Sequence, residues 1–263
     1  MAGKTDNLDM RQEFILHRIQ GGGEVTIDEL CTSLNTSVAT IRRDLDELEQ
    51  RSLLRRTRGG AVPIGPLFYE PFRHDASFQD MLKRFAAEKR RIARAAAHLV
   101  HKGETVALSG GTTTTEVVRY LKLLSGITII TNTVNVAMEL SSCKEIDVVV
   151  TGGQLRGNWF TLIGPLANQG AQMAFADIMF IGVDGIEVQQ GLTCTHPHEA
   201  ELLRILASHS KRRVVVADHS KIGNVAKWLL CPTTEIHLII TDNGATDEMI
   251  APFQKLGIEV NRV

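Results

Sequence analysis

Two short stretches of the chain carry residues whose types and spacing could do chemistry. The first is SGGTTTT at residues 109–115, which follows the apolar run VAL and precedes the helical pattern EVVRYL. A Gly-Gly turn between a buried strand and a helix presents backbone N–H groups, and the helix dipole favours negative charge there. Threonine hydroxyls add further donors. This stretch therefore favours binding of a phosphate or another anion, with an ordinary strand-to-helix turn as the alternative.

The second stretch is TSVATIRRDL at residues 36–45. We predict a helix over residues 37–51, because apolar residues recur at helical spacing and would be buried, namely Val38, Ile41, Leu45 and Leu48. The outward face then carries hydroxyl and guanidinium groups, from Ser37, Thr40, Arg42 and Arg43. Arginine can bind guanine O6 and N7 in the major groove of DNA. The alternative is a solvated helix face whose arginines pair with nearby acids, Asp44, Asp46 and Glu47.

The residues before this helix predict two further helices that would position it. The first has a shared face made by Leu8, Arg11, Ile15 and Ile19, and it stops at the glycines of residues 21–23. The second begins at TIDE, where Thr26 and Glu29 form a capping box. Asn35 and Thr36 then make the tight turn into the third helix, because Asn tolerates the left-handed region.

A small β-ribbon is predicted directly after the third helix. The stretch SLLRRTRGGAVP at residues 52–63 permits a hairpin with Gly59 and Gly60 at its tip. Arg58 on this ribbon would reach a phosphate or the adjacent minor groove. Three helices followed by a ribbon are the plan of a winged helix-turn-helix, whose second helix of the pair enters the major groove.

The rest of the chain predicts a second, α/β domain. Residues 63–82 are rich in proline and aromatic residues and are expected to be an irregular connection. After a helix from about residue 85 to 100 come six apolar runs with helical stretches between them, TVAL, ITIIT, IDVVVT, DIMFIGVD, RVVVAD and HLIITD. Such runs are typical of a mostly parallel sheet covered on both faces. We therefore predict a DNA-binding domain at 1–62, a linker at 63–84 and an α/β domain at 85–263.

Composition narrows the classes of protein. The net charge of −1 gives no overall basic signature, so the DNA-binding prediction depends on local patches. One further basic run, KRFAAEKRRIAR at residues 83–94, is expected to be a solvated helix face. No apolar run approaches the ~20 residues of a membrane-spanning helix, and the polar N-terminus has no signal-peptide pattern. The cysteines, Cys31, Cys143, Cys194 and Cys231, are widely spaced and are expected to be reduced thiols of a cytoplasmic protein.

Cofactor and metal motifs are weak in this chain. The SGGTTTT loop matches neither a Walker A sequence nor the G-x-G-x-x-G fingerprint, which disfavours ATP and dinucleotides. His196, His198 and Glu199 in THPHEAE could suggest a metal site, but no further ligand is identifiable. We therefore expect neither a cofactor nor a metal ion.

The N-terminal pattern resembles the helix-turn-helix signature of the DeoR family of bacterial transcriptional regulators. Arg11, three residues, Ile15, three residues, Ile19 and seventeen residues are followed by SVATIRRDL. The family's L-x-R-x-x-G-G-A wing follows here as LLRRTRGGAV. The resemblance implies sequence-specific binding to double-stranded operator DNA, as a homodimer or homotetramer.

The resemblance extends over most of residues 85–242. Sensor domains of this family resemble the ribose 5-phosphate isomerase fold and commonly bind sugar phosphates. The family's D-S-G-T-T loop aligns with residues 109–113, so Ser109 replaces the usual Asp and a carboxylate contact to a sugar hydroxyl is lost or supplied elsewhere. The resemblance and the loop chemistry together place ten residues at the effector, Ser109, Gly110, Gly111, Thr112, Thr113, Thr114, Asn132, Asp184, Glu199 and Lys221.

Three functions compete on these grounds. The preferred one is a transcriptional regulator, commonly a repressor of a carbohydrate-utilisation operon, controlled by a phosphorylated sugar. The second is a sugar-phosphate isomerase with an accessory DNA-binding domain, disfavoured because no lysine lies between Asp184 and Glu199. The third is a constitutive DNA-binding protein with a vestigial sensor, suggested only by Ser109. We therefore expect a protein that is not an enzyme.

Overall fold

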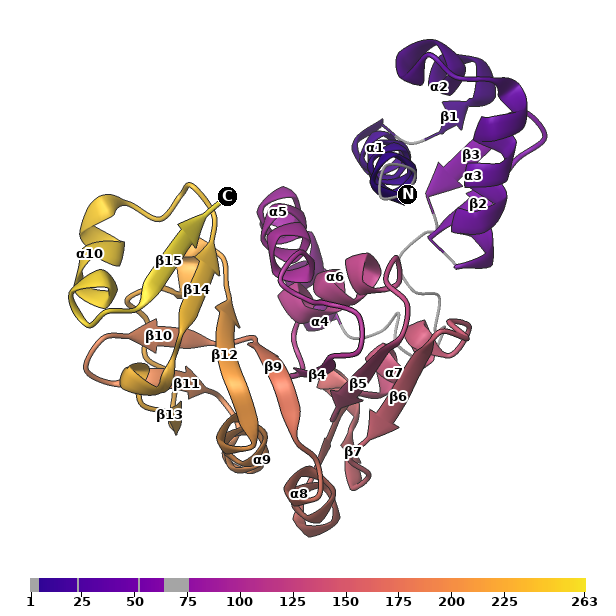
Figure 1. Ribbon diagram of the computed structural model, residues 1–263. Coiled ribbons are helices and arrows are strands. Elements are labelled where there is room, and N and C mark those ends of the chain that lie inside the picture. Colours follow the sequence, from indigo (N-terminus) through magenta and orange to yellow (C-terminus); the bar gives the residue numbers. More distant parts are fainter. Residues whose placement is uncertain (1–4, 23, 52, 64–75) are drawn as a thin grey trace. The chain divides into compact units, whose positions relative to one another are not determined.

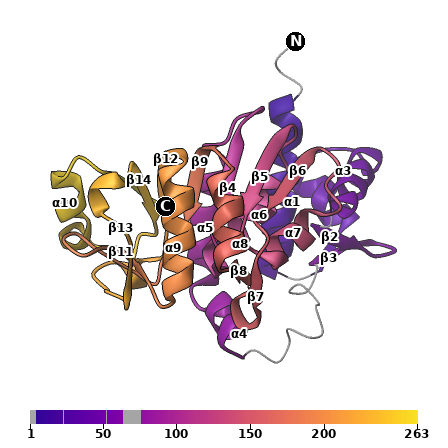
Figure 2. The ribbon, with the colours of Figure 1, turned by 90° about the horizontal axis from the view of Figure 1, so that it is seen from below.

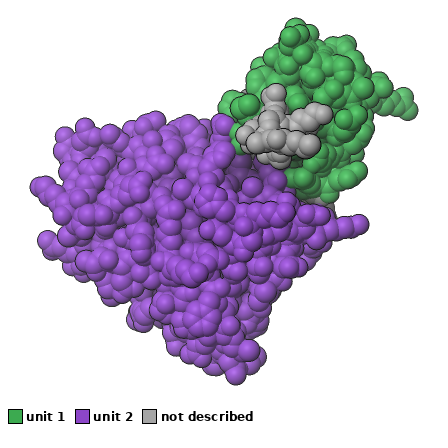
Figure 3. Space-filling model, in the orientation of Figure 1, with its two compact units in different colours: residues 1–70 green, residues 71–263 purple. Residues whose placement is uncertain are grey.

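The computed structural model describes residues 5–22, 24–51, 53–63 and 76–263. The chain divides into two compact units, Met1–Glu70 and Pro71–Val263 (Figure 3). Each unit has its own hydrophobic core.

The first unit is the winged helix-turn-helix that the sequence predicts. It contains the helices α1 (Thr5–Gly22), α2 (Ile27–Leu34) and α3 (Val38–Gln50), and the strands β1 (Val25–Thr26), β2 (Leu54–Arg56) and β3 (Gly60–Pro63) (Figure 1). The strands form an antiparallel sheet in the order β1-β3-β2. The strand β1, which the sequence did not predict, pairs with the wing strand β3 and so joins the wing to the start of α2.

Local chemistry sets the ends of α2 and α3. Thr26 and Glu29 form the predicted capping box, in which each side chain bonds the other residue's backbone N–H. Asn35 ends α2 in the left-handed region with φ of 46°, as the sequence predicted. Ser37 caps α3, and its Oγ accepts a hydrogen bond from the backbone N–H of Thr40 at 3.2 Å.

The core of the first unit contains Ile41, Leu45 and Leu48, as predicted. The expectation that Val38 is buried with them is wrong, because its side chain is 41% exposed. Val38 is the first residue of α3 and lies one turn before Ile41, beyond the part of the helix that packs on the core. A carboxylate, Asp44, lies buried on this face instead.

The second unit is built on a seven-stranded sheet in which every neighbouring pair is parallel, which confirms the predicted α/β class. Its strands are β4 (Thr105–Leu108), β5 (Ile127–Thr131), β6 (Ile146–Val150), β9 (Ala176–Ile181), β12 (Ser210–Val216), β14 (Leu238–Thr241) and β15 (Glu259–Arg262). The order across the sheet is β15-β14-β12-β9-β4-β5-β6. From β4 the chain first adds strands on one side and then returns to place β9 on the other side.

Helices cover both faces of this sheet (Figures 1 and 2). One face packs on α5 (Ala86–Ala97), α6 (Thr112–Leu121) and α7 (Val134–Leu140), and the other on α8 (Pro165–Gln172), α9 (Pro197–Ser208) and α10 (Asp247–Lys255). Alternate residues of each central strand supply the two cores, because strand side chains point to opposite faces. In β9, for example, Ile178 and Phe180 belong to the α5–α6 core, and Met179 and Ile181 belong to the α9 core.

Shorter elements surround the ends of the large sheet. A three-stranded sheet joins β10 (Gly185–Glu187), β11 (Gly191–Cys194) and β13 (Trp228–Cys231), and a hairpin joins β7 (Gln154–Arg156) to β8 (Thr161–Ile163). Single turns of 3-10 helix lie at Gly157–Trp159, His219–Lys221 and Thr233–Glu235.

The predicted linker differs from the structure at its end. Residues 64–75 lie outside the described part of the chain, but Ala76–Lys83 form the helix α4 and are not irregular. Among the described helices, none is long and apolar enough to cross a bilayer. The structure has all four cysteines as thiols; Cys194 and Cys231 are buried, and Cys31 and Cys143 are half-buried.

Candidate functional site

The outward face of α3 carries the two arginines that the sequence placed there. Arg42 and Arg43 are exposed, and neither guanidinium makes an ion pair with another residue of the described chain. The acids that could have paired with them bind other arginines: Asp44 binds Arg11, Asp46 binds Arg56 and Glu47 binds Arg51. The structure therefore does not show the alternative in which Arg42 and Arg43 pair with nearby acids of the same helix.

The other DNA-binding candidates lie at the start of α3 and on the wing. The hydroxyls of Ser37 and Thr40 share a hydrogen bond of 2.9 Å, so part of their bonding capacity is used within the helix cap. Arg58 is exposed in the turn between β2 and β3. Arg56 ties the wing to α3 through its ion pair with Asp46. These contacts fix the wing against the helix that would read DNA.

A cleft in the second unit lies at the carboxyl ends of β4, β9 and β12. Its lining includes residues that directly follow these strands, namely Gly110–Thr113, Gly182–Asp184, Ala217, Asp218 and Lys221. The cleft has an empty volume of about 690 Å³, with its open mouth included. Because β4 is where the chain changes its direction of winding, the cleft lies at a topological switch point. Ligands of open parallel sheets bind at such points.

The Gly-Gly turn after β4 forms one wall of the cleft. Gly111 has φ of 138° directly before α6, a conformation that residues with a side chain rarely adopt. A Cβ at Gly110 would lie 2.6 Å from the Thr161 methyl carbon and 3.4 Å from Oε1 of Glu199. The backbone can therefore approach a ligand here, and α6 directs its N-terminus to this wall. Thr112 and Thr113 also line the cleft.

Three of the predicted effector residues lie behind this wall. Ser109 is fully buried; its Oγ accepts a hydrogen bond from the Gly182 N–H at 2.8 Å and so joins the ends of β4 and β9. The Thr114 hydroxyl donates to the Gly111 carbonyl at 2.9 Å. Asn132 is fully buried and donates to the Leu162 carbonyl at 3.3 Å. None of the three is among the residues that line the cleft in the described chain.

The acidic side of the cleft holds Asp184 and Glu199. Asp184 follows β9 and accepts a hydrogen bond from the Thr195 N–H at 2.8 Å. Glu199, in the first turn of α9, pairs with Arg156 at 3.2 Å. Burial raises the pKa of Glu199 to about 7, against the opposing effect of Arg156 and with a smaller contribution from Asp184. This carboxyl group can therefore donate or accept a hydrogen bond near neutral pH.

The basic side of the cleft holds Lys221 and a lysine that the sequence analysis missed. Lys89 is 1% exposed and lines the cleft from α5, and burial lowers its pKa. The expectation that residues 83–94 form only a solvated face is therefore wrong at Lys89. The signal was present in the spacing, because Lys89 shares a helix face with Ile92, Ala93 and Ala96. Arg156 and Trp159 also line the cleft without having been predicted.

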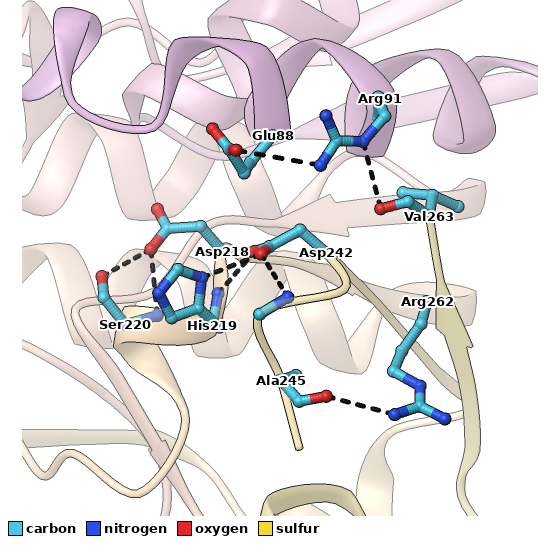
Figure 4. Close-up of polar contacts among 10 residues, drawn as sticks. Glu88, Arg91, Asp218, His219, Ser220, Asp242, Ala245, Arg262 and Val263 are labelled. Carbon is cyan, nitrogen blue, oxygen red and sulfur yellow. Dashed lines mark hydrogen bonds and ion pairs between the residues drawn. The ribbon is translucent and has the colours of Figure 1, made fainter. Parts of the chain in front are cut away.

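The turn that carries Lys221 is fixed by two aspartates (Figure 4). Asp218 caps it by accepting from the Ser220 N–H at 3.1 Å. Asp242 accepts from the His219 N–H at 2.8 Å and the Gly244 N–H at 2.9 Å, and pairs with His219 Nδ1. Although burial acts in the opposite direction, these bonds hold the pKa of Asp242 below its ordinary value. Lys221 is thus presented by a rigid turn.

The THPHEAE segment does not gather metal ligands. His198 faces Glu201 at 3.8 Å, and Glu199 is paired with Arg156. In the described residues, no three His, Cys, Asp or Glu side chains form a group that could hold a metal ion.

Comparison with known proteins places both units in one family. The model of the DeoR-like helix-turn-helix domain matches residues 11–65, and that of the DeoR C terminal sensor domain matches residues 84–243. The HTH-type transcriptional regulator GolR of Listeria innocua is 33% identical, over 95% of this chain and 96% of its own. The putative aga operon transcriptional repressor of Escherichia coli O157:H7 is 32% identical, over 95% and 92%.

Solved structures similar to the chain include an isomerase. Ribose 5-phosphate isomerase A from Methanocaldococcus jannaschii is 21% identical, with a TM-score of 0.39, over 52% of this chain and 54% of that one. The family itself is shown by the two domain models and by relatives matched over nearly their whole length. The chain therefore belongs to the DeoR family of transcriptional regulators, with an N-terminal helix-turn-helix and a C-terminal sensor domain.

Proposed function

We propose that the protein represses a carbohydrate-utilisation operon and that a phosphorylated sugar, bound in the cleft, controls its affinity for operator DNA. The observation that carries this proposal is the division of charge in the cleft. The α6 N-terminus, Lys89 and Lys221 suit a phosphate, and Asp184 and Glu199 suit sugar hydroxyls. A ligand with an anionic end and a polyhydroxyl end matches both sides.

Repression is proposed from the relatives. The relative from Escherichia coli O157:H7 is described as a putative operon repressor, and GlcR of Bacillus subtilis, 31% identical over 94% of this chain and 93% of its own, as a transcriptional repressor. We place its action in the cytoplasm, where it would bind double-stranded operator DNA as a homodimer or homotetramer.

The proposed effector site contains two groups of residues. Those that line the cleft would touch the ligand: Gly110, Gly111, Thr112, Thr113, Asp184, Glu199 and Lys221. Ser109, Thr114 and Asn132 would hold the loop from behind through the hydrogen bonds described above. With Ser109 in this supporting place, the contact to a sugar hydroxyl that the family's Asp supplies falls to Asp184 or Glu199.

DNA binding is tested by fluorescence anisotropy on DNA upstream of the protein's own gene cluster. The proposed DNA contacts are Ser37, Thr40, Arg42, Arg43 and Arg58. Arg42→Ala and Arg43→Ala should each weaken operator binding by about tenfold or more, because each removes a phosphate or base contact. Arg18→Ala, an exposed arginine on α1, serves as the matched control and should change little. Equal affinity for operator and random duplex would contradict the proposal.

Effector binding is tested by thermal unfolding with a panel of sugar phosphates and the corresponding free sugars. A native-state ligand raises the melting temperature by mass action. Lys221→Met should abolish the rise, whereas Lys227→Met, an exposed lysine outside the cleft lining, should leave it intact. A free sugar that stabilises as strongly as its phosphate would rule out the phosphate contact.

The isomerase alternative needs its own test, because the structure weakens one argument against it. No lysine lies between Asp184 and Glu199 in sequence, but Lys89 and Lys221 reach the same cleft from other parts of the chain. Isomerisation moves a proton between adjacent carbons and would incorporate deuterium from D₂O at the sugar carbon next to the carbonyl. We expect no incorporation above the uncatalysed rate, since the relatives matched over nearly their whole length are regulators. Enzyme-like exchange would reverse this conclusion.

A further inference from the structure

The part of the sensor that directly follows the stretch leading from the helix-turn-helix also forms part of the cleft. We call residues 76–89 the strap; it comprises α4, the bend at Phe85 and the start of α5. Met81 and Lys89 of the strap line the cleft. The segment through which the DNA-binding unit is joined to the sensor thus also borders the proposed effector.

The strap is held at three places. Phe78 is 7% exposed and packs edge-on against Trp159 and Phe160, with ring centroids 5.9 and 5.1 Å apart. Phe85, in the left-handed region with φ of 54°, packs against the His219 ring at 4.7 Å. The third anchor is Lys89, whose Nζ donates to the carbonyls of Met81 and Arg84, the latter at 2.8 Å. Both carbonyls belong to the strap, so one ammonium closes its end.

Lys89 has bonding capacity left over. An ammonium has three N–H donors, and two of them bind the strap carbonyls. Among the described residues, no carboxylate forms an ion pair with Lys89; Asp218 attracts it only from a longer distance. A buried cation without a close counter-charge is costly. An anion in the cleft would supply that counter-charge to a group that already holds the strap.

We infer that Lys89 couples occupancy of the cleft to the strap, because its Nζ is shared between the anionic end of the ligand and the carbonyls that close α4 onto α5. An anion at the third donor favours the charged ammonium and keeps it in place. The ligand also contacts the strap through Met81, which borders the cleft. The strap therefore tightens when the cleft is filled, and the change passes along the chain to the DNA-binding unit. This inference rests on the proposed function.

The first test is hydrogen exchange of the full-length protein without ligand. Lys89→Met removes the ammonium and its hydrogen bonds to the carbonyls of Met81 and Arg84, but keeps an apolar side chain of similar length. We expect amides of residues 78–85 to exchange about tenfold faster than in the unmodified protein. Lys122→Met is the matched control, because Lys122 is also buried and pairs with Glu139, outside the cleft lining. It should leave α4 exchange unchanged, and equal α4 exchange in Lys89→Met and the unmodified protein overturns the inference.

The second test adds inorganic phosphate as the probe, against chloride at equal ionic strength. Phosphate should slow exchange in residues 78–85 of the unmodified protein and of Lys122→Met, and this response should be lost in Lys89→Met. If phosphate raises the melting temperature but leaves strap exchange unchanged, the site binds anions and the inference is wrong. If neither phosphate nor any sugar phosphate changes the melting temperature or DNA affinity, the proposed function fails as well.

A second variant separates binding from coupling. Phe78→Ala removes the aromatic anchor and leaves Lys89 in the cleft. We expect phosphate still to raise its melting temperature, whereas the change in operator affinity on adding the active sugar phosphate falls at least severalfold. An operator response equal to that of the unmodified protein would overturn the inference, since the ligand would then act without the strap.

Discussion

Glu199 combines burial, a close arginine and a second carboxylate in one place. Its side chain is 14% exposed and pairs with Arg156, and burial raises its pKa to about 7. In the unfolded chain the pKa of this group is ordinary, near 4.5. Between these two values the folded protein binds more protons at Glu199 than the unfolded chain does. The stability that this group contributes is present at low pH and is lost as the pH rises through about 7.

We predict that Glu199→Gln flattens this dependence on pH. Relative to the variant, the free energy of unfolding of the unmodified protein should fall by roughly 2–3 kcal/mol between about pH 5 and pH 8. Urea unfolding at several pH values measures it, with Glu201→Gln, an exposed glutamate on the same helix, as the control. Parallel pH profiles for Glu199→Gln and the unmodified protein would contradict the prediction.

At the residue scale, the sequence identified the loop residues of the cleft better than the rest of its lining. Gly110, Gly111, Thr112 and Thr113 were predicted together because they are adjacent in the chain, and all four line the cleft. Lys89 was missed because a lysine in a basic run usually faces solvent. Which face of such a helix is buried depends on the elements that pack against it, and a single sequence does not reveal these. The burial of Asp44 was missed for the same reason, since its half-buried partner, Arg11, lies on another helix.

At the scale of elements, the Arg11–Asp44 pair joins α1 to α3. It has two hydrogen bonds, from Nε to Oδ2 at 2.9 Å and from Nη2 to Oδ1 at 3.1 Å. Asp44 is 1% exposed and Arg11 20%. A planar guanidinium bound at two points fixes orientation as well as distance. The pair therefore sets the rotation of α3, and with it the direction in which Arg42 and Arg43 point.

We predict that Asp44→Ala destabilises the helix-turn-helix by roughly 1–3 kcal/mol, because it leaves Arg11 partly buried without its carboxylate. Glu47→Ala breaks a more exposed ion pair on the same helix, with Arg51, and should cost about 0–1 kcal/mol. Chemical unfolding monitored by circular dichroism measures both. Arg11→Met combined with Asp44→Leu should recover much of the lost stability but not operator affinity; equal losses for Asp44→Ala and Glu47→Ala would refute this account.

Elements with strong periodicity or apolar runs were predictable, and elements defined by tertiary pairing were not. Six of the seven strands of the large sheet coincide with runs of apolar residues that the sequence singled out. The seventh, β15, reads EVNR and pairs only at the sheet edge, where polar residues are tolerated. The two-residue strand β1 and the hairpin β7–β8 are too short for any pattern to identify them.

At the scale of the whole molecule, an operator with two-fold symmetry requires two helix-turn-helix units. We predict that the protein sediments as at least a dimer and protects two half-sites whose centres lie about 10 base pairs, or a multiple of that, apart. Affinity should fall linearly with salt on logarithmic axes, because phosphate contacts release counterions. A monomer that binds one half-site with full affinity would contradict this prediction. If Arg42 contacts a phosphate, Arg42→Ala should reduce the steepness of this salt dependence by about one. If Arg42 contacts a base, the salt dependence should stay the same and the protein should discriminate less between bases at one operator position.

The distribution of the thiols makes the protein suited to site-selective labelling without mutagenesis. Burial raises the pKa of Cys194 to about 11 and that of Cys231 to about 12, so both stay protonated and react slowly with maleimides. Cys31 and Cys143 are half-buried, and one lies in each of the two units. A donor and an acceptor dye introduced at these two thiols would report by energy transfer how the units respond to an effector.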